Sequence, residues 1–504
     1  MNRILQKFSR AARIALVGGA LFTPYFLSAQ QAGGHIKKGT VNFNAKGEQL
    51  TRYSTLGDAI DAHDGEIAYF GDTYYLYGTS YDCGFEWGNK GAPFCGFKVY
   101  TSKDMHNWTD RGMLFDAETD VWQSRCDGKT YGCFRPHVIY NARTRNYVLW
   151  INVYDNVVGY RVFTSKNPAG PFTEVAEPKL AVNAQQPAAG LNNGDHDLFV
   201  DDDGTAYLAL TDWRKRGSIA IEKLSDDYLS GTGEVAENVT DSLTEAPGMF
   251  KRNGRYYVLY SDPNCGYCSG TGTSYKTARS PLGPWSEGRK ISDNSCGGQP
   301  SFVSTIKLKG GDIFLYGSDL WNNAAKNEAL ANFFWSALEF DGEGAIKPIL
   351  CNPGSPAPLV ASSETRYEIR RDTQQMQVFI PEKTGTIAQI SLTLYKRNAP
   401  EAPLSIAIIP LDDAQKPAGP ALFHSEISSA KLGWSPKKIS IAPKIRMQSG
   451  KRYGIVLSTK ASTGAYGALI SAETAPKNRV LSSPDGGKTY RPEKEHALKL
   501  DVRR

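Results

Sequence analysis

Three carboxylates precede three copies of one sequence pattern: a short apolar strand, a Gly-containing turn and a second apolar-aromatic strand. They are Asp64, Asp195 and Glu245. We predict that they lie at equivalent points of a repeated hairpin. Carboxyl groups that lie close together raise one another's pKa, and a neighbouring arginine lowers it. Separating the pKa values of paired carboxyls in this way produces one general acid and one general base near neutral pH.

The corresponding position can be read in two further repeats. Gln299 follows two glycines in the fifth repeat, and Phe134 or Arg135 stands there in the second. We therefore predict a ring of three acids, one amide and one guanidinium. Such a ring suits cleavage of a glycosidic bond with inversion, in which one carboxylic acid protonates the leaving oxygen. A second carboxylate activates water, and the two groups are then roughly 6.5–9.5 Å apart.

Neighbouring acids are alternatives for these roles. Asp61 competes with Asp64 for the role of base. Asp197 shares a strand face with Asp195, but it lies deeper and is expected to bond to backbone. The acidic run at 201–203 has the composition of a solvated hairpin turn. For Glu245, a plain surface position is the alternative.

The elements that must position these residues recur five times between residues 51 and 352. Each unit of roughly 50–70 residues reads as a meander of strands, which is typical of a β-propeller blade. The inner strands of such blades line one channel, so residues far apart in sequence can meet at its mouth. We predict an all-β fold with a five-bladed β-propeller, and a large β-sandwich is the alternative. The recognisable second strands are 74–77, 147–150, 206–209, 256–259 and 313–316.

The pattern changes on both sides of the repeats. Residues 30–50 are rich in Gly and Gln and are expected to form a mobile N-terminal arm. Residues 360–504 lose the blade pattern and show the alternation of a half-exposed antiparallel sheet, which predicts a β-sandwich accessory domain. This module has no diagnostic motif, so a packing role and a carbohydrate-binding role both stay open. Residues 483–490 resemble one Asp-box hairpin and are interpreted as a turn.

Residues 1–29 have the charged start, apolar run and small-residue cleavage site of a secretory signal peptide, which predicts export to the periplasm or medium. The chain has 58 Lys and Arg against 52 Asp and Glu; removing the four basic residues of this segment leaves 54 against 52, or +2. A nucleic-acid partner normally needs a strong basic excess, so it is excluded. No later apolar run is long enough to span a membrane.

The eight cysteines fit an exported chain, where disulfides form readily. Close pairs are Cys83 with Cys95 and Cys126 with Cys133, while Cys296 and Cys351 are left over. Connectivity does not follow from sequence. The remaining pair, at 265 and 268, could alternatively be half of a redox or zinc motif, although no second pair or His cluster accompanies it.

Because of these motifs, residues 51–350 resemble glycoside hydrolase family 43, whose members are five-bladed propellers that hydrolyse with inversion of configuration at the anomeric carbon. In that family the base lies seven residues before the Gly of a Gly-Asp-Thr-Tyr-Tyr turn, which matches Asp64 and Gly71. The aspartate that tunes the acid and orients substrate matches Asp195. The acid of a Glu-Ala-Pro motif matches Glu245. The resemblance thus implies Asp64 as general base, Glu245 as general acid and Asp195 as pKa modulator.

The resemblance also bears on metals and substrate. Many members have a His near a channel metal where this chain has Gln299, so we predict no metal site and no required cofactor, with a structural calcium as the alternative. The 135–141 and 319–321 segments are similar to the exo-β-1,3-galactanase branch. That branch, however, has Gly in place of Asp64 and Glu in place of Phe134. Retention of Asp64 favours ordinary base catalysis.

We therefore predict an α-L-arabinofuranosidase that acts on side chains of plant polysaccharides. An exo-β-1,3-galactosidase, a β-xylosidase and, outside the enzymes, a non-catalytic glycan-binding propeller are the alternatives. His63 and His196 are expected to face away from the acids beside them, without a metal role. Side chains expected to contact substrate are Gln299, Arg135, Phe134, Trp122, Trp87, Trp213 and Trp321, and burial between blades is the alternative for each Trp.

Overall fold

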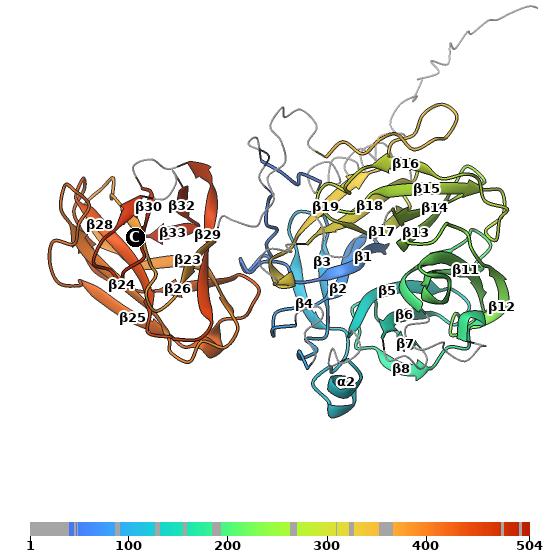
Figure 1. Ribbon diagram of the computed structural model, residues 1–504, viewed down its shortest axis with the longest axis horizontal. Helices are drawn as coiled ribbons and strands as arrows, with labels where there is room; N and C mark the ends of the chain where they lie inside the picture. Colours follow the sequence, from blue (N-terminus) through green and yellow to red (C-terminus); the bar gives the residue numbers. More distant parts are fainter. Residues whose placement is uncertain are drawn as a thin grey trace, which may run out of the picture.

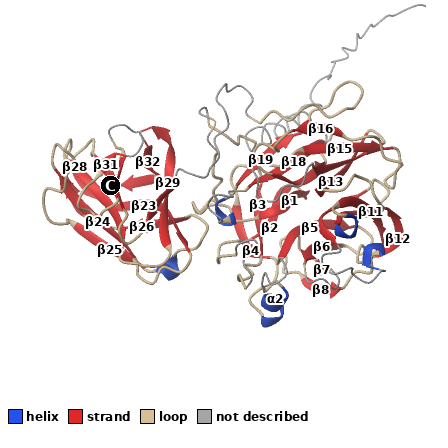
Figure 2. Cartoon of the chain, viewed as in Figure 1, coloured by secondary structure: helices blue, strands red, loops and turns tan. Residues whose placement is uncertain are grey.

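The computed structural model describes residues 40–504 apart from twelve gaps. Figure 1 shows a propeller and a smaller β-sandwich side by side, and Figure 2 shows that strands dominate both, so the predicted fold class is confirmed. The predicted signal peptide, Trp87 and the cysteines at 265 and 268 lie outside the described residues. The gaps are residues 45–46, 48, 86–90, 127–131, 155–158, 184–192, 263–269, 309, 322–326, 352–365, 475–477 and 493–495.

Five antiparallel sheets form the propeller, and the first four contain four strands each while the fifth contains three. The first blade contains β1 (His63–Phe70), β2 (Thr73–Thr79), β3 (Phe97–Ser102) and β4 (Thr109–Met113). The second contains β5 (Cys133–Asn141), β6 (Asn146–Val153), β7 (Tyr160–Ser165) and β8 (Thr173–Ala176). The third contains β9 (Asn193–Val200), β10 (Ala206–Asp212), β11 (Ser218–Leu224) and β12 (Gly231–Ala236). The fourth and fifth contain β13 (Glu245–Arg252), β14 (Arg255–Ser261), β15 (Thr273–Ala278), β16 (Arg289–Ser292), β17 (Gln299–Ile306), β18 (Ile313–Leu320) and β19 (Asn332–Ala337).

The inner strands close a ring. Each of β1, β5, β9, β13 and β17 contacts the inner strands of both neighbouring blades, and β17 returns to β1. Apolar and aromatic side chains fill the spaces between blades, as in the cluster of Phe250, Tyr257 and Phe314 between blades four and five. One blade cannot bury both of its faces alone, so it packs against its neighbours. This packing brings the first residues of the five inner strands to one end of the channel.

The N-terminal arm differs from the expectation where the structure describes it. Asn42 and Phe43 are buried. The Asn42 side chain donates to the carbonyl of Trp335 on β19 and accepts from its N–H, both over 2.9 Å. The arm therefore covers the open edge of the three-stranded fifth blade. An unpaired edge strand exposes backbone polar groups, and this packing satisfies one pair of them.

The C-terminal region is a sandwich of two six-stranded sheets. Alternate side chains such as Leu392, Ile406 and Ile455 form its dry core. In the Asp-box segment, Asp485 accepts from the N–H and the hydroxyl of Thr489 at 2.9 and 2.6 Å, as expected of a turn. The sheets comprise β20 (Arg366–Ile369), β29 (Ala465–Thr474), β23 (Gln389–Arg397), β26 (Lys437–Ile441), β32 (His496–Leu498) and β33 (Leu500–Arg503), and β25 (Phe423–Ile427), β24 (Leu404–Leu411), β28 (Arg452–Thr459), β21 (Gln374–Phe379), β30 (Val480–Ser483) and β31 (Arg491–Pro492), with β22 (Gly385–Ile387) and β27 (Ile445–Met447) as a separate pair.

Three disulfides lie among the described residues of the propeller region. They join Cys83 to Cys95, Cys126 to Cys133 and Cys296 to Cys351. The third links the segment before β17 to the chain that follows blade five, across 55 positions of sequence. Two of the three close pairs read from the sequence are thus bonded, the third lies outside the described residues, and the two left-over cysteines bond to each other. Among the described residues, no helix is long and apolar enough to cross a membrane.

Candidate active site

The inner strands share an irregularity close to their first residue. The pairing register shifts between His63 and Glu66 in β1, between Phe134 and His137 in β5, and between Glu245 and Gly248 in β13. In β9 the residues from Asn193 to His196 oppose only Leu210–Asp212. In each case the inner strand advances by three residues where its partner strand advances by two, so the inner strand contains one extra residue. Such bulges bend a strand and change the direction of its side chains.

The three acids occupy successive positions of this bulged stretch. Glu245 is its first residue, Asp64 its second and Asp195 its third. The expectation that they lie at equivalent points of the hairpin is therefore corrected by one or two residues. A regular strand would send adjacent positions to opposite faces. The bulge removes that alternation, and Asp64 and Arg135 adopt φ angles of 53° and 59° within it.

Asp64 is buried and its carboxylate is held from three sides. Oδ1 accepts from the Thr79 hydroxyl at 2.6 Å and from the Arg135 N–H at 3.2 Å, and Oδ2 accepts from the Tyr81 hydroxyl at 2.7 Å. Burial raises the pKa of Asp64 to about 6, against the lowering effects of the Arg135 charge and the two hydroxyls. Asp64 is therefore ionised at neutral pH and protonated in mild acid.

A second layer of polar groups supports Asp64 from behind. Its N–H donates to Oδ2 of Asp319 over 3.0 Å, and the Ser301 hydroxyl donates to the same oxygen. Nδ1 of His63 lies 3.4 Å from the other oxygen of Asp319. His63 thus contacts Asp319, and its ring packs on those of Tyr81 and Trp321 at 5.4 and 5.9 Å. Asp61, the alternative base, is 1% exposed and accepts from the Tyr81 N–H over 2.9 Å.

Arg135 connects two of the acids. Its Nη2 donates to Oδ2 of Asp195 over 2.8 Å, while its N–H donates to Asp64. Nη1 donates to the carbonyls of Pro300 and Ser301 over 3.2 and 3.0 Å. The side chain is 3% exposed, yet the charges of Asp195 and Asp64 raise the pKa of Arg135 in spite of the opposing effect of burial. A buried guanidinium paired in this way keeps its charge.

Glu245 accepts at Oε1 from Nε2 of Gln299 over 2.6 Å. Burial and then the nearby Asp195 carboxylate raise the pKa of Glu245 to about 8, against smaller lowering effects of Arg135 and Gln299. Trp321 donates from Nε1 to Oε1 of Gln299 over 3.3 Å. Glu245 is therefore a neutral carboxylic acid at pH 7 and can donate a proton.

The predicted ring is assembled, and aromatic side chains form the adjacent wall. Phe134 is buried in a cluster with Tyr81 and Tyr154, and Trp213 and Trp321 are partly buried against it. Sequence reasoning missed Tyr81 and Tyr154. Nothing in the sequence around these two tyrosines distinguishes them from aromatic residues of the core. Burial and the charges of Asp195 and Glu245 raise the pKa of Tyr154.

Trp122 lies elsewhere. It belongs to helix α2 (Asp120–Arg125) and packs 4.9 Å from the ring of Phe115 and 5.4 Å from that of Phe163. The structure thus supports burial between blades for Trp122 and does not bring it to the ring of acids. Trp122 and Trp213 both follow a predicted strand, so the sequence does not distinguish them. Only the packing in the folded chain shows that Trp122 is away from the ring of acids.

Deeper in the channel, two further carboxylates tie adjacent blades together. Oδ2 of Asp197 accepts from the Met249 N–H over 2.6 Å, as expected of an acid bonded to backbone. Glu66 accepts in the same way from the Val138 N–H. Nδ1 of His137 lies 3.1 Å from the other oxygen of Asp197, and the ring of His196 packs 5.2 Å from that of His137 and 5.0 Å from that of Tyr160. Within the described ranges no group of three or more His, Cys, Asp or Glu side chains is arranged to hold a metal ion.

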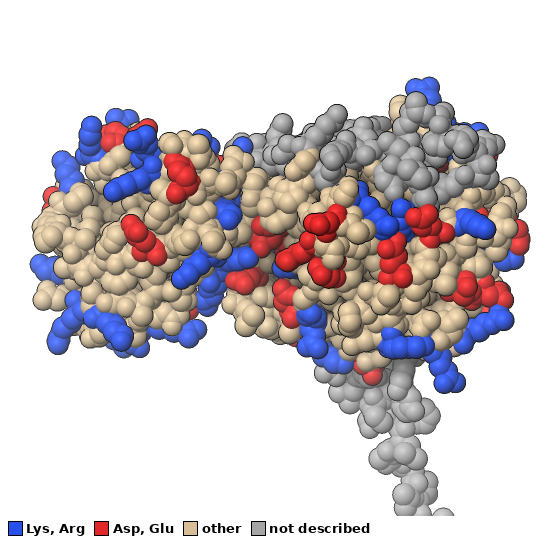
Figure 3. All heavy atoms as spheres, turned by 90° about the horizontal axis from the view of Figure 1, so that it is seen from below, with Lys and Arg blue, Asp and Glu red and all other residues tan. Residues whose placement is uncertain are grey.

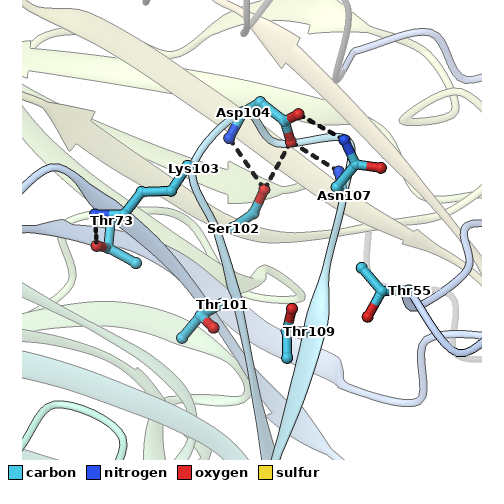
Figure 4. Close-up of a pocket in the computed structure, with 8 residues that line it drawn as sticks. All are labelled: Thr55, Thr73, Thr101, Ser102, Lys103, Asp104, Asn107 and Thr109. Atoms are coloured by element: carbon cyan, nitrogen blue, oxygen red, sulfur yellow. Dashed lines mark hydrogen bonds between the residues drawn. The ribbon is translucent and has the colours of Figure 1, made fainter.

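A surface pocket of about 280 Å³ lies at the opposite end of blade one. Thr73 opposes Phe70 at the end of β1, whereas Asp64 lies near its beginning. Figure 4 shows that the polar groups of this pocket bond to one another: Asp104 accepts from the Asn107 side chain over 2.7 Å, and Lys103 donates to Thr73 over 2.6 Å. We assign it no part in the chemistry.

Comparison with known proteins agrees with this geometry. Residues 59–304 match the family model described as Glycosyl hydrolases family 43. The chain is 26% identical over 265 residues to Beta-D-galactofuranosidase xynD of Aspergillus niger, and the alignment covers 50% of this chain and 74% of that protein. It is 28% identical over 209 residues to an arabinoxylan arabinofuranohydrolase of Paenibacillus polymyxa, and this alignment covers 37% of this chain and 32% of that protein.

Among solved structures, an exo-beta-1,3-galactanase from Clostridium thermocellum aligns with 89% of this chain and 95% of its own. The TM-score is 0.52 and the identity 20%, so the likeness concerns the fold. The alignment extends past the propeller, and the order of propeller and sandwich is thus shared.

Proposed function

We propose that this chain is a member of glycosyl hydrolases family 43, whose model matches residues 59–304, and that it is an exo-acting, inverting glycoside hydrolase in which Asp64, Asp195 and Glu245 carry the reaction. The observation that supports these roles best is the contrast between two buried carboxyls of one site. The pKa of Asp64 is about 6 and that of Glu245 about 8, so at pH 7 one is a base and the other an acid.

Glu245 supplies the proton. The leaving-group oxygen of a glycosidic bond needs protonation as the bond to the anomeric carbon breaks. Gln299 donates to Oε1 of Glu245, so the acidic proton resides on Oε2, on the side away from the amide. Proton transfer leaves Glu245 ionised beside Asp195 and near Arg135, whose positive charge stabilises the new carboxylate.

Asp64 activates the nucleophile. Oδ1 already accepts two hydrogen bonds, from the Thr79 hydroxyl and the Arg135 N–H, whereas Oδ2 accepts one from Tyr81 and keeps a lone pair for a water molecule. The carboxylate takes one proton from that water while the oxygen attacks the anomeric carbon from the face opposite the leaving group. At the end Asp64 is protonated, Glu245 is ionised, and solvent exchange restores both.

Asp195 holds the other two groups in their roles. Its negative charge raises the pKa of Glu245, and its ion pair with Arg135 places a positive charge between the two halves of the site. One oxygen of Asp195 bonds to Arg135, so the other can accept from a sugar hydroxyl. We propose that Asp195 orients the sugar in this way.

For the substrate we propose terminal α-L-arabinofuranose on plant polysaccharide side chains. Several relatives are described as arabinofuranosidases, including the arabinoxylan enzyme of Paenibacillus polymyxa. The relative described as a galactofuranosidase favours a second candidate, β-D-galactofuranose. Both sugars are five-membered rings, and they differ in the exocyclic group that the aromatic wall must accommodate. The disulfides fit the proposal of an exported enzyme, because such bonds persist in oxidising compartments. The expectation that no cofactor is required stays a prediction.

A substrate screen with matched variants tests the proposal. Purified protein is incubated with arabinoxylan, arabinogalactan, β-1,3-galactan and galactofuranose-containing glycans, and released monosaccharides are quantified. We expect arabinose as the main product from the wild type and none from Asp64→Asn. Galactose release from β-1,3-galactan that survives Asp64→Asn would overturn the assignment of Asp64, and glycan binding without any product would favour a lectin.

A further inference from the structure

The sandwich domain places one tryptophan beside the candidate active site. Trp434 lies between the short helix η5 (Ser429–Lys431) and β26, and it is 7% exposed. Its side chain belongs to the aromatic cluster of Tyr81, Phe85 and Phe134, which otherwise consists of propeller residues. A sandwich residue is therefore part of the wall that borders the acids.

Hydrogen bonds and one ion pair fix the position of Trp434 against the propeller. The Trp434 N–H donates to the carbonyl of Asp82 over 3.0 Å, and the Ser435 N–H donates to the Asp82 carboxylate over 2.9 Å. Lys437 forms an ion pair with the other oxygen of Asp82 at 2.7 Å. Figure 3 shows acidic and basic side chains next to each other where the two domains meet. Asp82 directly follows Tyr81 in the chain.

Two glycines show how close the approach is. A Cβ on Gly84, whose φ is +105°, would lie 2.8 Å from the Trp434 indole. A Cβ on Gly433 would lie 1.8 Å from the Asp82 carboxylate. Each domain thus has a glycine where the other domain inserts a side chain. Contacts under 3.0 Å force a shift, so both positions require the absence of a side chain.

The insertion leads directly to the proposed base. Trp434 contacts Asp82 and Gly84 on the loop that begins at Tyr81, and the Tyr81 ring belongs to the same aromatic cluster. The Tyr81 hydroxyl in turn donates to Asp64 over 2.7 Å. The Tyr81 N–H is anchored by Asp61 over 2.9 Å. This loop is therefore held by Asp61 at Tyr81, by the sandwich at Asp82 and Gly84, and by the disulfide from Cys83 to Cys95.

We propose that Trp434 is a positioning residue, through which the sandwich domain holds Tyr81 on Asp64 and so completes the active site of the propeller. This inference rests on the proposed role of Asp64. Trp434 is buried, so it acts through Tyr81 and not by stacking on a sugar. The sandwich is thus a structural part of the active site and not an independent binding module.

The experiment is a double-mutant cycle in the full-length protein. Wild type, Trp434→Ala, Tyr81→Phe and the double variant are compared by kcat/KM against pH, using the better of 4-nitrophenyl α-L-arabinofuranoside and 4-nitrophenyl β-D-galactofuranoside. We expect Trp434→Ala to lower kcat/KM roughly 10- to 100-fold in the wild-type background and less than 3-fold in the Tyr81→Phe background, because misplacement of a reacting group has effects of about this size. The acidic limb should shift alike in both single variants.

Two controls separate positioning from stability. Ile406→Ala removes a buried side chain from the sandwich core, away from the junction, and is expected to lower Tm without changing the pH profile. Trp434→Phe keeps an aromatic ring and should restore most of the activity. If Trp434→Ala and Ile406→Ala reduced Tm and activity in parallel, or if the cycle were additive, Trp434 would be a structural residue and the inference would be wrong.

Failure of the proposed function would look different. Asp64→Asn is assayed alongside the cycle. If it kept wild-type turnover, the role of the base would be wrong whatever the Trp434 variants did. If it were inactive while Trp434→Ala behaved as wild type, only the role of Trp434 would be overturned.

Discussion

Gln299 donates from Nε2 to Oε1 of Glu245 over 2.6 Å, and a third side chain determines the orientation of its amide. The indole of Trp321 is a donor only, and it lies 3.3 Å from the amide oxygen of Gln299. The oxygen of the amide must therefore face Trp321, and its nitrogen must face Glu245. This arrangement keeps the proton of Glu245 on Oε2, where a leaving group could accept it.

Replacing Gln299 by Leu should shift the alkaline limb of the pH profile. The amide donor stabilises the ionised form of Glu245, so its loss raises the pKa of Glu245 further. We expect the limb to move to higher pH and kcat to fall about tenfold as the acid loses its orientation. Trp321→Phe, which frees the amide without removing it, should shift the limb in the same direction by less. An unchanged limb in both variants would show that Gln299 has no influence on the acid.

Replacing Glu245 by Gln should abolish hydrolysis of natural glycans while the fold survives. Loss of a general acid costs roughly 10²- to 10⁴-fold in rate. An aryl glycoside with a nitrophenolate leaving group needs little protonation and should lose much less activity. The ratio of the two losses is measured by comparing arabinose release from arabinoxylan with nitrophenol release. Equal losses on both substrates would contradict the role of acid.

The rate should depend on pH through a bell-shaped profile. Asp64 must be ionised, so kcat/KM falls as the pH drops through about 6, and Glu245 must be protonated, so it falls as the pH rises through about 8. The optimum therefore lies near pH 7. Steady-state kinetics between pH 4 and 10 measure both limbs, with Asp61→Asn as a control for the acidic one. Coupling of the acids makes the limbs properties of the site as a whole.

Glu245 should also make the protein less stable at alkaline pH. Its pKa is about 8 when folded against a model value of 4.5, so between these values the folded state binds a proton that the unfolded state has lost. The free energy of unfolding therefore falls as the pH rises from about 4.5 through about 8, by on the order of 4 kcal/mol. Glu245→Gln lacks this loss, so its Tm should exceed that of the wild type at pH 9 and approach it at pH 4. Parallel Tm curves for the two proteins would contradict the raised pKa.

Trp122 and Trp321 should respond differently to substitution. Trp122→Ala leaves a void beside Phe115 and Phe163 and should cost about 3–5 kcal/mol of stability with KM unchanged in the folded fraction. Trp321→Ala removes the partner of Gln299 and should lower kcat with a smaller loss of stability. Chemical unfolding together with steady-state kinetics measures both effects. A raised KM in Trp122→Ala would restore its predicted contact with substrate.

The sequence by itself was sufficient for the properties that local patterns determine. Alternating strands and turn residues recur with each blade, so the propeller, the sandwich and the strands that carry the three acids could be predicted from periodicity. The joint presence of Asp64, Asp195 and Glu245 before these hairpins was enough to predict paired acid-base chemistry. The close cysteine pairs were readable for the same reason, since their partners are neighbours in the chain.

Only the tertiary structure decided how these groups act on one another. The bulges that offset the acids by one and two positions arise from pairing with a second strand, and no single strand encodes them. Burial raises the pKa of both Glu245 and Asp64, and the neighbouring groups that separate the two values come from several blades. The place of Trp434 against the loop of Tyr81 depends on the docking of two domains, which joins residues 353 positions apart in sequence, as the bond between Ser435 and Asp82 shows. A pKa and a contact are set by everything that surrounds a group, and the surroundings of these residues exist only in the folded chain.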